Sequence, residues 1–129
     1  MREAVFVNDG PMPEDWLALM REWGRVVALP GLGNSPSYRE ALHLALAAPD
    51  DAIAYLAEDD YLYDDAALQK MAEAFGELPV VDYVTLYDHL DRYTRVDDAR
   101  GGLSRVFIAG GHHWRTVEST CMTFGARVS

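Results

Sequence analysis

The sequence has a single cysteine, few basic residues and no long apolar run. One cysteine, Cys121, excludes a disulfide within the chain and is typical of a protein in a reducing compartment, so we expect a cytoplasmic location. No apolar stretch reaches the roughly 18 residues that a membrane-spanning helix needs, so we expect no membrane span. The opening residues MREAVFV lack the basic, apolar and small-residue order of a secretion signal.

Basic residues are scarce relative to acidic ones. The chain holds 11 Lys and Arg against 21 Asp and Glu, a formal net charge of -10 over 129 residues. Nucleic acids bind proteins through clustered Lys and Arg, so we expect no nucleic-acid partner. An acidic protein can still bind an anionic ligand when a divalent cation lies between them. Half of the residues are hydrophobic, which is typical of a soluble globular protein, and the length predicts a single domain.

Apolar segments alternate with amphipathic ones over the first two thirds of the chain. Short apolar runs bounded by turn residues predict strands at 4–7, 25–30, 51–58 and 80–88. Helical periodicity predicts helices at 14–24, 38–48 and about 64–75, the first with Trp16 and Trp23 in the core and the second opened by a Ser37–Glu40 capping box. Strands separated by such helices pair in parallel through right-handed crossovers. The sequence therefore predicts an α/β fold, a three-layer sandwich around a mostly parallel, Rossmann-like sheet.

The pattern changes after Asp88. Residues 89–104 are polar and have no period, which indicates a loop. Residues 105–110 read as a strand, and the segments at 112–117 and 120–128 flank Glu118-Ser119. The sequence predicts a C-terminal β-hairpin around that pair.

Three consecutive carboxylates, Glu58, Asp59 and Asp60, follow an apolar run. Like charges in contact cost free energy unless a positive charge lies between them. In open α/β sheets ligands bind outside the carboxyl ends of the strands, and Asp9 and Asp88 end two further predicted strands. A divalent cation would resolve the repulsion, because Mg²⁺ takes one or two protein carboxylates and leaves positions for substrate phosphates. The alternative is a solvated loop that caps the next helix.

Three segments in this order resemble successive parts of the nucleotide-sugar half of glycosyltransferases with the GT-A fold, broadly of the family 2 type. They are VFVNDG at 5–10, GLGNSPSYREALHLAL at 31–46 and IAYLAEDDYLYDDAALQKM at 53–71. The last resembles the DxD region, in the Glu-Asp-Asp form of N-acetylglucosaminyltransferases. The resemblance implies one GT-A-like domain over 1–129 that binds a nucleotide-diphosphate sugar. It also implies transfer of the sugar to an acceptor that the sequence does not identify, with Mn²⁺ or Mg²⁺ as cofactor.

The resemblance also implies roles for individual residues. Asp9 would contact the nucleotide, Glu58 and Asp59 the ribose and sugar, and Asp60 the cation that bridges the diphosphate. GT-A enzymes often recruit a late residue, sometimes a histidine, to the metal or diphosphate. Because strand residues alternate in direction, only one of the adjacent histidines at 112 and 113 can face the sheet edge, and His113 is the candidate metal ligand. An exposed hairpin histidine is the alternative.

Three further residues are candidates for the chemistry. An inverting transferase needs a carboxylate base to take the proton of the acceptor hydroxyl. Glu118 and Asp88 are the candidates for that base, and each also fits an ordinary turn residue. Arg39 could bind a phosphate from the first turn of the helix predicted at 38–48, or lie on its solvated face.

A second hypothesis is a catalytically silent domain of the same type that binds a nucleotide or a partner. GT-A enzymes normally carry a further strand and helix before the strand that ends in NDG, so the chain resembles a minimal or truncated member. Without that strand a sheet edge is left unpaired, which invites pairing between copies and predicts a possible homo-oligomer. A third hypothesis is a sugar nucleotidyltransferase, but the loop GLGNSPS lacks the basic residue that those enzymes carry.

Overall fold

The structure is a computed structural model that describes residues 3–88, 104–120 and 122–128. Its chain divides into two compact units, Met1–Ala47 and Ala48–Ser129, each with its own strands and helices. The predicted alternation of strands and helices up to residue 88 is confirmed. Among the described residues, no helix combines the length and apolar character needed to cross a membrane.

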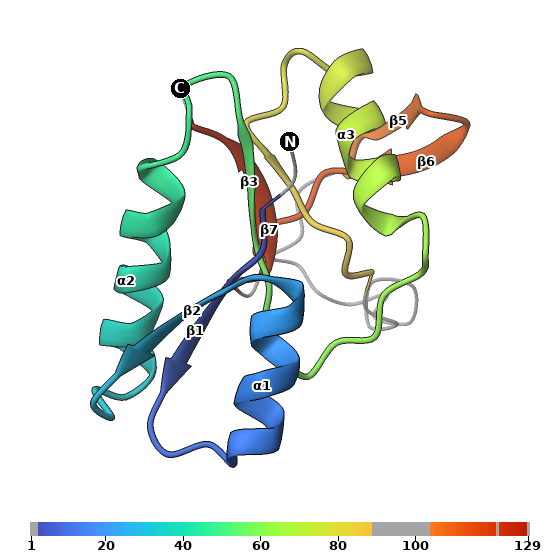
Figure 1. Ribbon diagram of the computed structural model, residues 1–129. Coiled ribbons are helices and arrows are strands. Elements are labelled where there is room, and N and C mark those ends of the chain that lie inside the picture. Colours follow the sequence, from blue (N-terminus) through green and yellow to red (C-terminus); the bar gives the residue numbers. More distant parts are fainter. Residues whose placement is uncertain (1–2, 89–103, 121, 129) are drawn as a thin grey trace, which may run out of the picture. The chain divides into compact units, whose positions relative to one another are not determined.

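The first unit is a β–α–β–α arrangement. It contains β1 (Val5–Asp9), α1 (Glu14–Trp23), β2 (Arg25–Leu29) and α2 (Asn34–Leu46). The two strands pair in parallel, from Val5 opposite Arg25 to Asp9 opposite Leu29. Helix α1 packs against β2 and α2 packs against β1 (Figure 1). This pair is the only parallel one among the described strands, and its parallel direction follows from the α1 crossover.

Gly24 lets α1 end directly beside β1. Its N–H donates to the carbonyl of Met20 at 2.9 Å, and the N–H of Arg25 donates to the carbonyl of Ala4 at 3.0 Å. A Cβ atom at position 24 would overlap the carbonyl oxygen of Ala4 and lie 2.8 Å from its carbonyl carbon. Only glycine therefore allows β2 to start at this separation from β1.

Two predictions for the helices of the first unit are wrong. Trp16 and Trp23 lie on the exposed side of α1, with 55% and 75% of their surface accessible, and not in a core. Helix α2 begins at Asn34 with Gly33 as its N-cap, four residues before the predicted start. The hydroxyl of Ser37 donates to the carbonyls of Gly33 and Asn34, so Ser37 lies inside the helix and forms no capping box.

The second unit contains a three-stranded sheet, a helix and a hairpin. Its elements are β3 (Ile53–Leu56), α3 (Ala67–Glu77), β4 (Tyr83–Val84), β5 (Val106–Ala109), β6 (His112–Arg115) and β7 (Phe124–Arg127). Strand β7 lies between β3 and β4 and is antiparallel to both (Figure 1). Strands β5 and β6 form a separate antiparallel pair.

The predicted three-layer sandwich with a mostly parallel, Rossmann-like sheet is therefore wrong. Strands β3 and β4 run in the same direction, as expected, but they do not pair with each other, because β7 lies between them. The predicted hairpin around Glu118-Ser119 is also wrong, since β6 pairs with β5 and β7 pairs elsewhere. The actual hairpin turns at Gly110-Gly111, whose φ values of 55° and 73° are the left-handed values that a two-residue turn requires.

The core of the second unit forms where α3 covers the sheet. Met71, Ala74 and Phe75 of α3 and Val84 of β4 make one buried cluster. On β7, Gly125 leaves room for this helix, because a Cβ there would overlap Met71 and lie 3.3 Å from the Phe75 ring. Arg127 donates to the carbonyl of Phe75 at 2.6 Å and places its guanidinium 5.2 Å from the centre of that ring. The β7 strand is thus held to α3 by both packing and polar contact.

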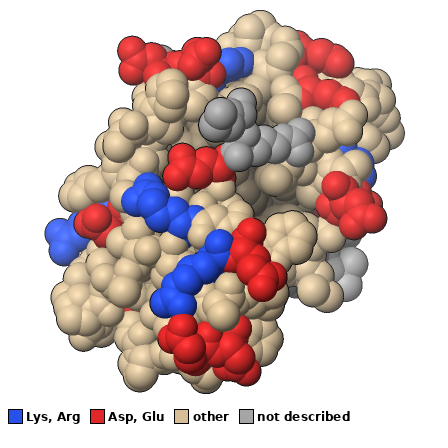
Figure 2. Space-filling model, in the orientation of Figure 1, with Lys and Arg blue, Asp and Glu red and all other residues tan. Residues whose placement is uncertain are grey.

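Acidic and basic side chains are intermixed on the face shown in Figure 2, where Lys and Arg side chains lie beside Asp or Glu. On α1, Arg21 pairs with Glu14, and both side chains are largely exposed. Exposed pairs of this kind contribute little to stability. The expectation that nucleic acid is not a partner stays a prediction.

Candidate functional site

A small cavity lies where β3 and β4 end in the second unit. The two strands run in the same direction on either side of β7, so their carboxyl ends share one edge of the sheet. The cavity at this edge has a volume of about 180 Å³. At about 30 Å³ per water molecule, this is room for one small ring and not for a whole nucleotide sugar. We call it the tyrosine cavity after the residues that line it, which include Tyr55, Tyr61, Tyr63, Tyr87, Lys70 and Thr123.

The four tyrosines form a connected cluster. The rings of Tyr55 and Tyr63 meet edge to face with centroids 6.0 Å apart, and the hydroxyl of Tyr55 donates to that of Tyr63 at 3.2 Å. Tyr61 lies 6.5 Å from Tyr63 and 5.0 Å from Tyr87 by ring centroids. Burial, reinforced by the bond to Tyr63, raises the pKa of Tyr55 far above its ordinary value. The cluster therefore offers an uncharged Tyr55 hydroxyl and flat apolar ring faces.

The three predicted carboxylates do not act as one group. Glu58 is half-buried, and its Oε2 accepts a hydrogen bond from the hydroxyl of Thr123 at 3.2 Å. Asp59 and Asp60 are exposed, and within the described ranges no hydrogen bond or ion pair engages them. The repulsion inferred from the sequence is thus relieved in part by geometry, with one carboxylate held by Thr123, just before β7, and two in solvent.

Thr123 is the polar residue that joins the strands of this edge. It is only 1% exposed and is the buried polar residue of the described chain. Its hydroxyl reaches Glu58 beyond β3, and its carbonyl accepts the hydroxyl of Thr85 from the β4 side at 2.8 Å. Sequence reasoning missed Thr123 and Thr85, because their partners are distant along the chain.

Lys70 is the basic group of the tyrosine cavity. Its Nζ lies 3.1 Å from Asp64 Oδ1, which also accepts the backbone N–H of Ala66 at 2.9 Å. The Ala66 N–H and then Lys70 lower the pKa of Asp64. Asp64 therefore closes the turn before α3, whose N-cap is Ala66 and has no side-chain cap, and Lys70 lies beside the cavity. Lys70 lies inside the segment that resembles the DxD region, but its residue type alone carried no signal.

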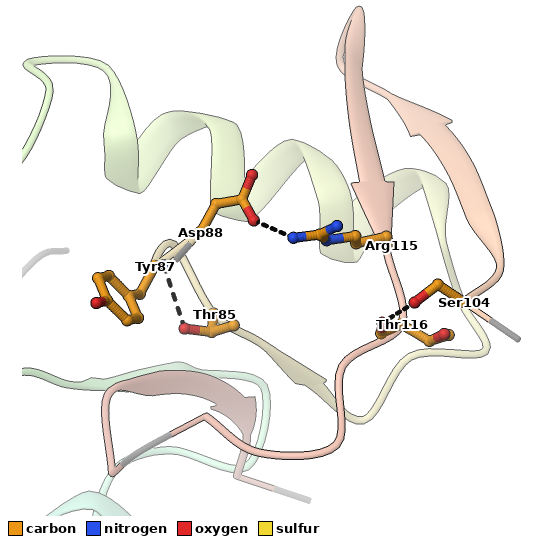
Figure 3. Close-up of polar contacts among 6 residues, drawn as sticks. All are labelled: Thr85, Tyr87, Asp88, Ser104, Arg115 and Thr116. Atoms are coloured by element: carbon orange, nitrogen blue, oxygen red, sulfur yellow. Dashed lines mark hydrogen bonds and ion pairs between the residues drawn. The ribbon is translucent and has the colours of Figure 1, made fainter. Parts of the chain in front are cut away.

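Asp88 joins the end of β4 to the hairpin (Figure 3). Its Oδ1 accepts a hydrogen bond from Arg115 Nη2 at 2.7 Å, and the Arg115 side chain is 21% exposed. On the same strand end, the hydroxyl of Thr85 accepts the N–H of Tyr87 at 3.3 Å. At the same open end of the hairpin, the hydroxyl of Ser104 donates to the carbonyl of Thr116 at 3.2 Å. Asp88 thus has a positioning role for the last residue of β6.

Asp9 belongs to the first unit, where its carboxylate organises the glycine loop. Oδ1 accepts the N–H groups of Gly31 and Leu32 at 2.9 and 2.7 Å, and Oδ2 accepts that of Gly33 at 2.7 Å. These bonds, that of Leu32 most of all, lower the pKa of Asp9. The geometry therefore gives Asp9 a structural role, and its predicted contact with a nucleotide stays a prediction.

The other candidates are exposed. Arg39 lies in the second turn of α2, because that helix begins earlier than predicted, so the argument from the first turn does not apply. His113 on β6 and Glu118 after it are both exposed. Glu118 lines a second cavity of the second unit, of about 720 Å³.

The fit of a divalent cation depends on Asp59 and Asp60. The described ranges contain no group of three or more His, Cys, Asp or Glu side chains placed to hold a metal ion. Two exposed carboxylates are hard oxygen donors, and they match the way Mg²⁺ binds with one or two protein ligands and substrate phosphates. The donor type of Asp59 and Asp60 suits such a cation, and both the predicted Mn²⁺ or Mg²⁺ and the assignment of Asp60 and His113 as its ligands stay predictions.

Comparisons of the chain with protein-family models, with curated proteins and with solved structures gave no match. The resemblance to GT-A glycosyltransferases therefore depends on the three sequence segments. The function of the second unit is therefore inferred from the residues at its sheet edge.

Proposed function

We propose that the second unit binds a nucleotide-diphosphate sugar at the edge formed by the ends of β3 and β4, and that the protein transfers the sugar to an acceptor hydroxyl. The observation that carries the proposal is the tyrosine cavity at that edge, whose lining residue Thr123 binds Glu58. Asp59 and Asp60 directly precede the lining residue Tyr61 in the chain. A flat-walled cavity for one small ring and a pair of solvent-facing carboxylates suit the two ends of such a ligand.

The sugar ring is the part of the ligand that the tyrosine cavity suits. Tyrosine rings supply large apolar faces with a polar tip, and a few fixed polar groups set the orientation of a ligand. Glu58, held by the hydroxyl of Thr123 at 3.2 Å, supplies an acceptor for a sugar hydroxyl. Lys70, 31% exposed beside the cavity, supplies a positive charge for a phosphate.

The diphosphate is the part that Asp59 and Asp60 suit. Both are acidic and exposed, so they attract a divalent cation and repel a bare phosphate. A cation bound with the diphosphate would offset the negative charge that grows on the leaving group. In this proposal the carboxylates of Asp59 and Asp60 would hold the cation, and the ammonium group of Lys70 would add a second positive charge.

The transfer needs a base. The acceptor oxygen forms a bond to the anomeric carbon, the bond from that carbon to the phosphate oxygen breaks, and the nucleoside diphosphate leaves with the electron pair. The hydroxyl proton passes to a carboxylate. Asp88 is bound to Arg115 at 2.7 Å, whereas Glu118 is exposed and no ion pair engages it in the described ranges, so we assign the base to Glu118.

Calorimetric and NMR titration with UDP- and GDP-sugars, with and without Mn²⁺, tests the proposal. We expect binding that requires Mn²⁺ and that weakens at least tenfold in the double variant Asp59→Asn, Asp60→Asn. The matched control is Glu22→Gln with Asp51→Asn, which removes the same charge from two exposed sites elsewhere. A folded protein that binds no sugar nucleotide with Mn²⁺, or equal weakening in the control, would refute the proposal.

A second candidate is binding without transfer. It is favoured by the engagement of Asp9, whose two carboxylate oxygens already accept three backbone N–H groups. Such a domain would bind a nucleotide sugar or a partner without cleaving it. Release of UDP from UDP-sugar, followed with an added alcohol or water as acceptor, separates the two candidates. Binding without any release over many hours supports the silent domain.

A further inference from the structure

The second unit holds a larger cavity beside the hairpin, about 720 Å³ in volume. We call it the hairpin cavity. Its volume lies within the range of roughly 300–1,000 Å³ that is usual for sites of small organic ligands. Its walls come from β4, from the hairpin and from the segment that joins β6 to β7, and four aromatic side chains are among them: Tyr83, Phe107, Trp114 and Phe124.

Contacts within the protein orient three of the four aromatic walls. Tyr83 and Phe124 meet edge to face, with ring centroids 5.3 Å apart and planes at 80°. The indole N–H of Trp114 donates to the carbonyl of Ala109 at 3.1 Å, which orients the ring. Rings fixed in this way form a site before any ligand arrives, so binding does not have to order them.

Polar side chains line the same cavity, from either side of β4, from β6 and from the segment after it: Asp82, Thr85, Arg115, Thr116, Glu118, Ser119 and Thr120. Arg115 is bound to Asp88 at 2.7 Å, next to Thr116 (Figure 3). A cavity that combines aromatic walls with polar side chains suits a ligand with an apolar body and a polar substituent. Arg115 and the threonine hydroxyl can donate to an oxygen, and the Glu118 carboxylate can accept from a hydroxyl.

The two cavities share stretches of backbone at two places, after β4 and at the start of β7. Thr85 lines the hairpin cavity, and the next two residues, Leu86 and Tyr87, line the tyrosine cavity. Thr123 lines the tyrosine cavity and Phe124 the hairpin cavity. A ligand in one cavity therefore lies beside backbone that also forms the other.

We propose that the hairpin cavity binds a planar aromatic molecule that carries a hydroxyl group. The aromatic body would pack between Trp114, Phe107 and the Tyr83–Phe124 pair, with the hydroxyl toward Glu118. Under the proposed function, on which this last step rests, the molecule is the acceptor, and its hydroxyl is the group that gives its proton to Glu118.

The first test uses the wild-type chain and 2-naphthol as the probe. Trp114 is a reporter, because a ring packed against its indole shifts the NMR signal of the indole N–H, whereas the exposed Trp16 and Trp23 serve as internal controls. We expect the Trp114 signal to shift with saturation while those of Trp16 and Trp23 stay fixed. An unchanged Trp114 signal, or equal shifts in all three, overturns the proposal.

The second test fills the cavity. Val117 is half-buried in the lining, whereas Val106 on β5 is 65% exposed and lies outside the lining. We expect Val117→Phe to weaken the binding of 2-naphthol at least tenfold and Val106→Phe to leave it unchanged. Thermal unfolding of both variants checks that they are folded, and the wild-type NMR result decides the matter if Val117→Phe does not fold. Equal affinity in all three folded proteins overturns the proposal.

The two proposals fail separately. Titration of Val117→Phe with UDP-glucose and Mn²⁺ is expected to match the wild type, because Val117 does not line the tyrosine cavity. Binding of UDP-glucose without binding of 2-naphthol refutes the hairpin cavity alone. Binding of 2-naphthol without binding of any sugar nucleotide refutes the proposed function and leaves the aromatic site standing, with no role as an acceptor site.

Discussion

Replacing Thr123 by valine tests whether this residue, just before β7, holds Glu58 in place. Valine has nearly the shape of threonine, so Thr123→Val removes the hydroxyl at a site only 1% exposed without opening a cavity. The loss is the hydrogen bond to Glu58 Oε2, while the backbone carbonyl that accepts from Thr85 remains. The perturbation is therefore confined to one contact.

The size of the effect follows from the geometry. A hydrogen bond to a charged group contributes roughly 1.5–3 kcal/mol. The distance of 3.2 Å is long for a hydroxyl donor, and Glu58 is half-buried, so water can replace the lost partner. We therefore expect a loss of about 1 kcal/mol in the free energy of unfolding. With a typical slope of about 2 kcal/mol per M of urea, the midpoint falls by about 0.5 M.

Urea unfolding followed by circular dichroism measures this loss, and Glu58→Gln completes a double-mutant cycle. We expect a coupling energy near 1 kcal/mol between the two positions, since they share the contact. Thr123→Ser is the matched variant: it loses a buried methyl group, at a cost of about 1 kcal/mol, but keeps the hydroxyl. Serine should keep the affinity for a sugar nucleotide, and valine should lower it about fivefold. A coupling energy near zero, or equal affinity for valine and wild type, would refute the reasoning.

Three further changes test the framework around the site. Gly24→Ala forces a Cβ atom into the backbone of Ala4, so we expect the free energy of unfolding to fall by at least about 1–3 kcal/mol, as measured by thermal or urea unfolding. Gly111→Ala is the comparison, because its Cβ meets open space and the substitution adds only the strain of a left-handed backbone. Phe75→Ala opens a cavity in the core under α3 and should lower the free energy of unfolding by about 3–5 kcal/mol, a large share of the stability of a small domain. A loss below about 1 kcal/mol in urea unfolding would contradict the packing. The pKa of Asp9 is lowered on folding, so its stabilising effect is present above the ordinary value of 3.8 and is lost as the pH falls through the depressed value. Asp9→Asn should therefore reduce the loss of stability on acidification below about pH 4. An unchanged pH profile would count against the loop contacts.

The order of elements up to residue 88 was predictable, but the pairing of strands was not. Periodicity and turn residues mark each strand by local signals, whereas the place of β7 depends on Gly125, which lets α3 approach the sheet with Met71 and Phe75. A glycine in a strand signals close approach without naming the partner. The β5–β6 hairpin, in contrast, was predictable, because Gly110-Gly111 between two strand-like segments is a turn signal in the sequence.

The candidate site was predictable only in its acidic part. Glu58, Asp59 and Asp60 stand out because three charges follow an apolar run, and they do lie at a strand end. Thr123 and Lys70 carry no such signal, since a threonine before a strand and a lysine in a helix are ordinary. Their importance arises from contacts made across the fold, from Thr123 to Glu58 and from Lys70 to the cavity.

The central position of β7 has a consequence for synthesis on the ribosome. Strands β3 and β4 leave the ribosome long before residues 124–127, and among the described strands β7 is their only sheet partner. A nascent chain halted before that point presents two open strand edges, which invite pairing with other chains. Chaperone protection should therefore matter most in the interval between the emergence of β4 and that of β7.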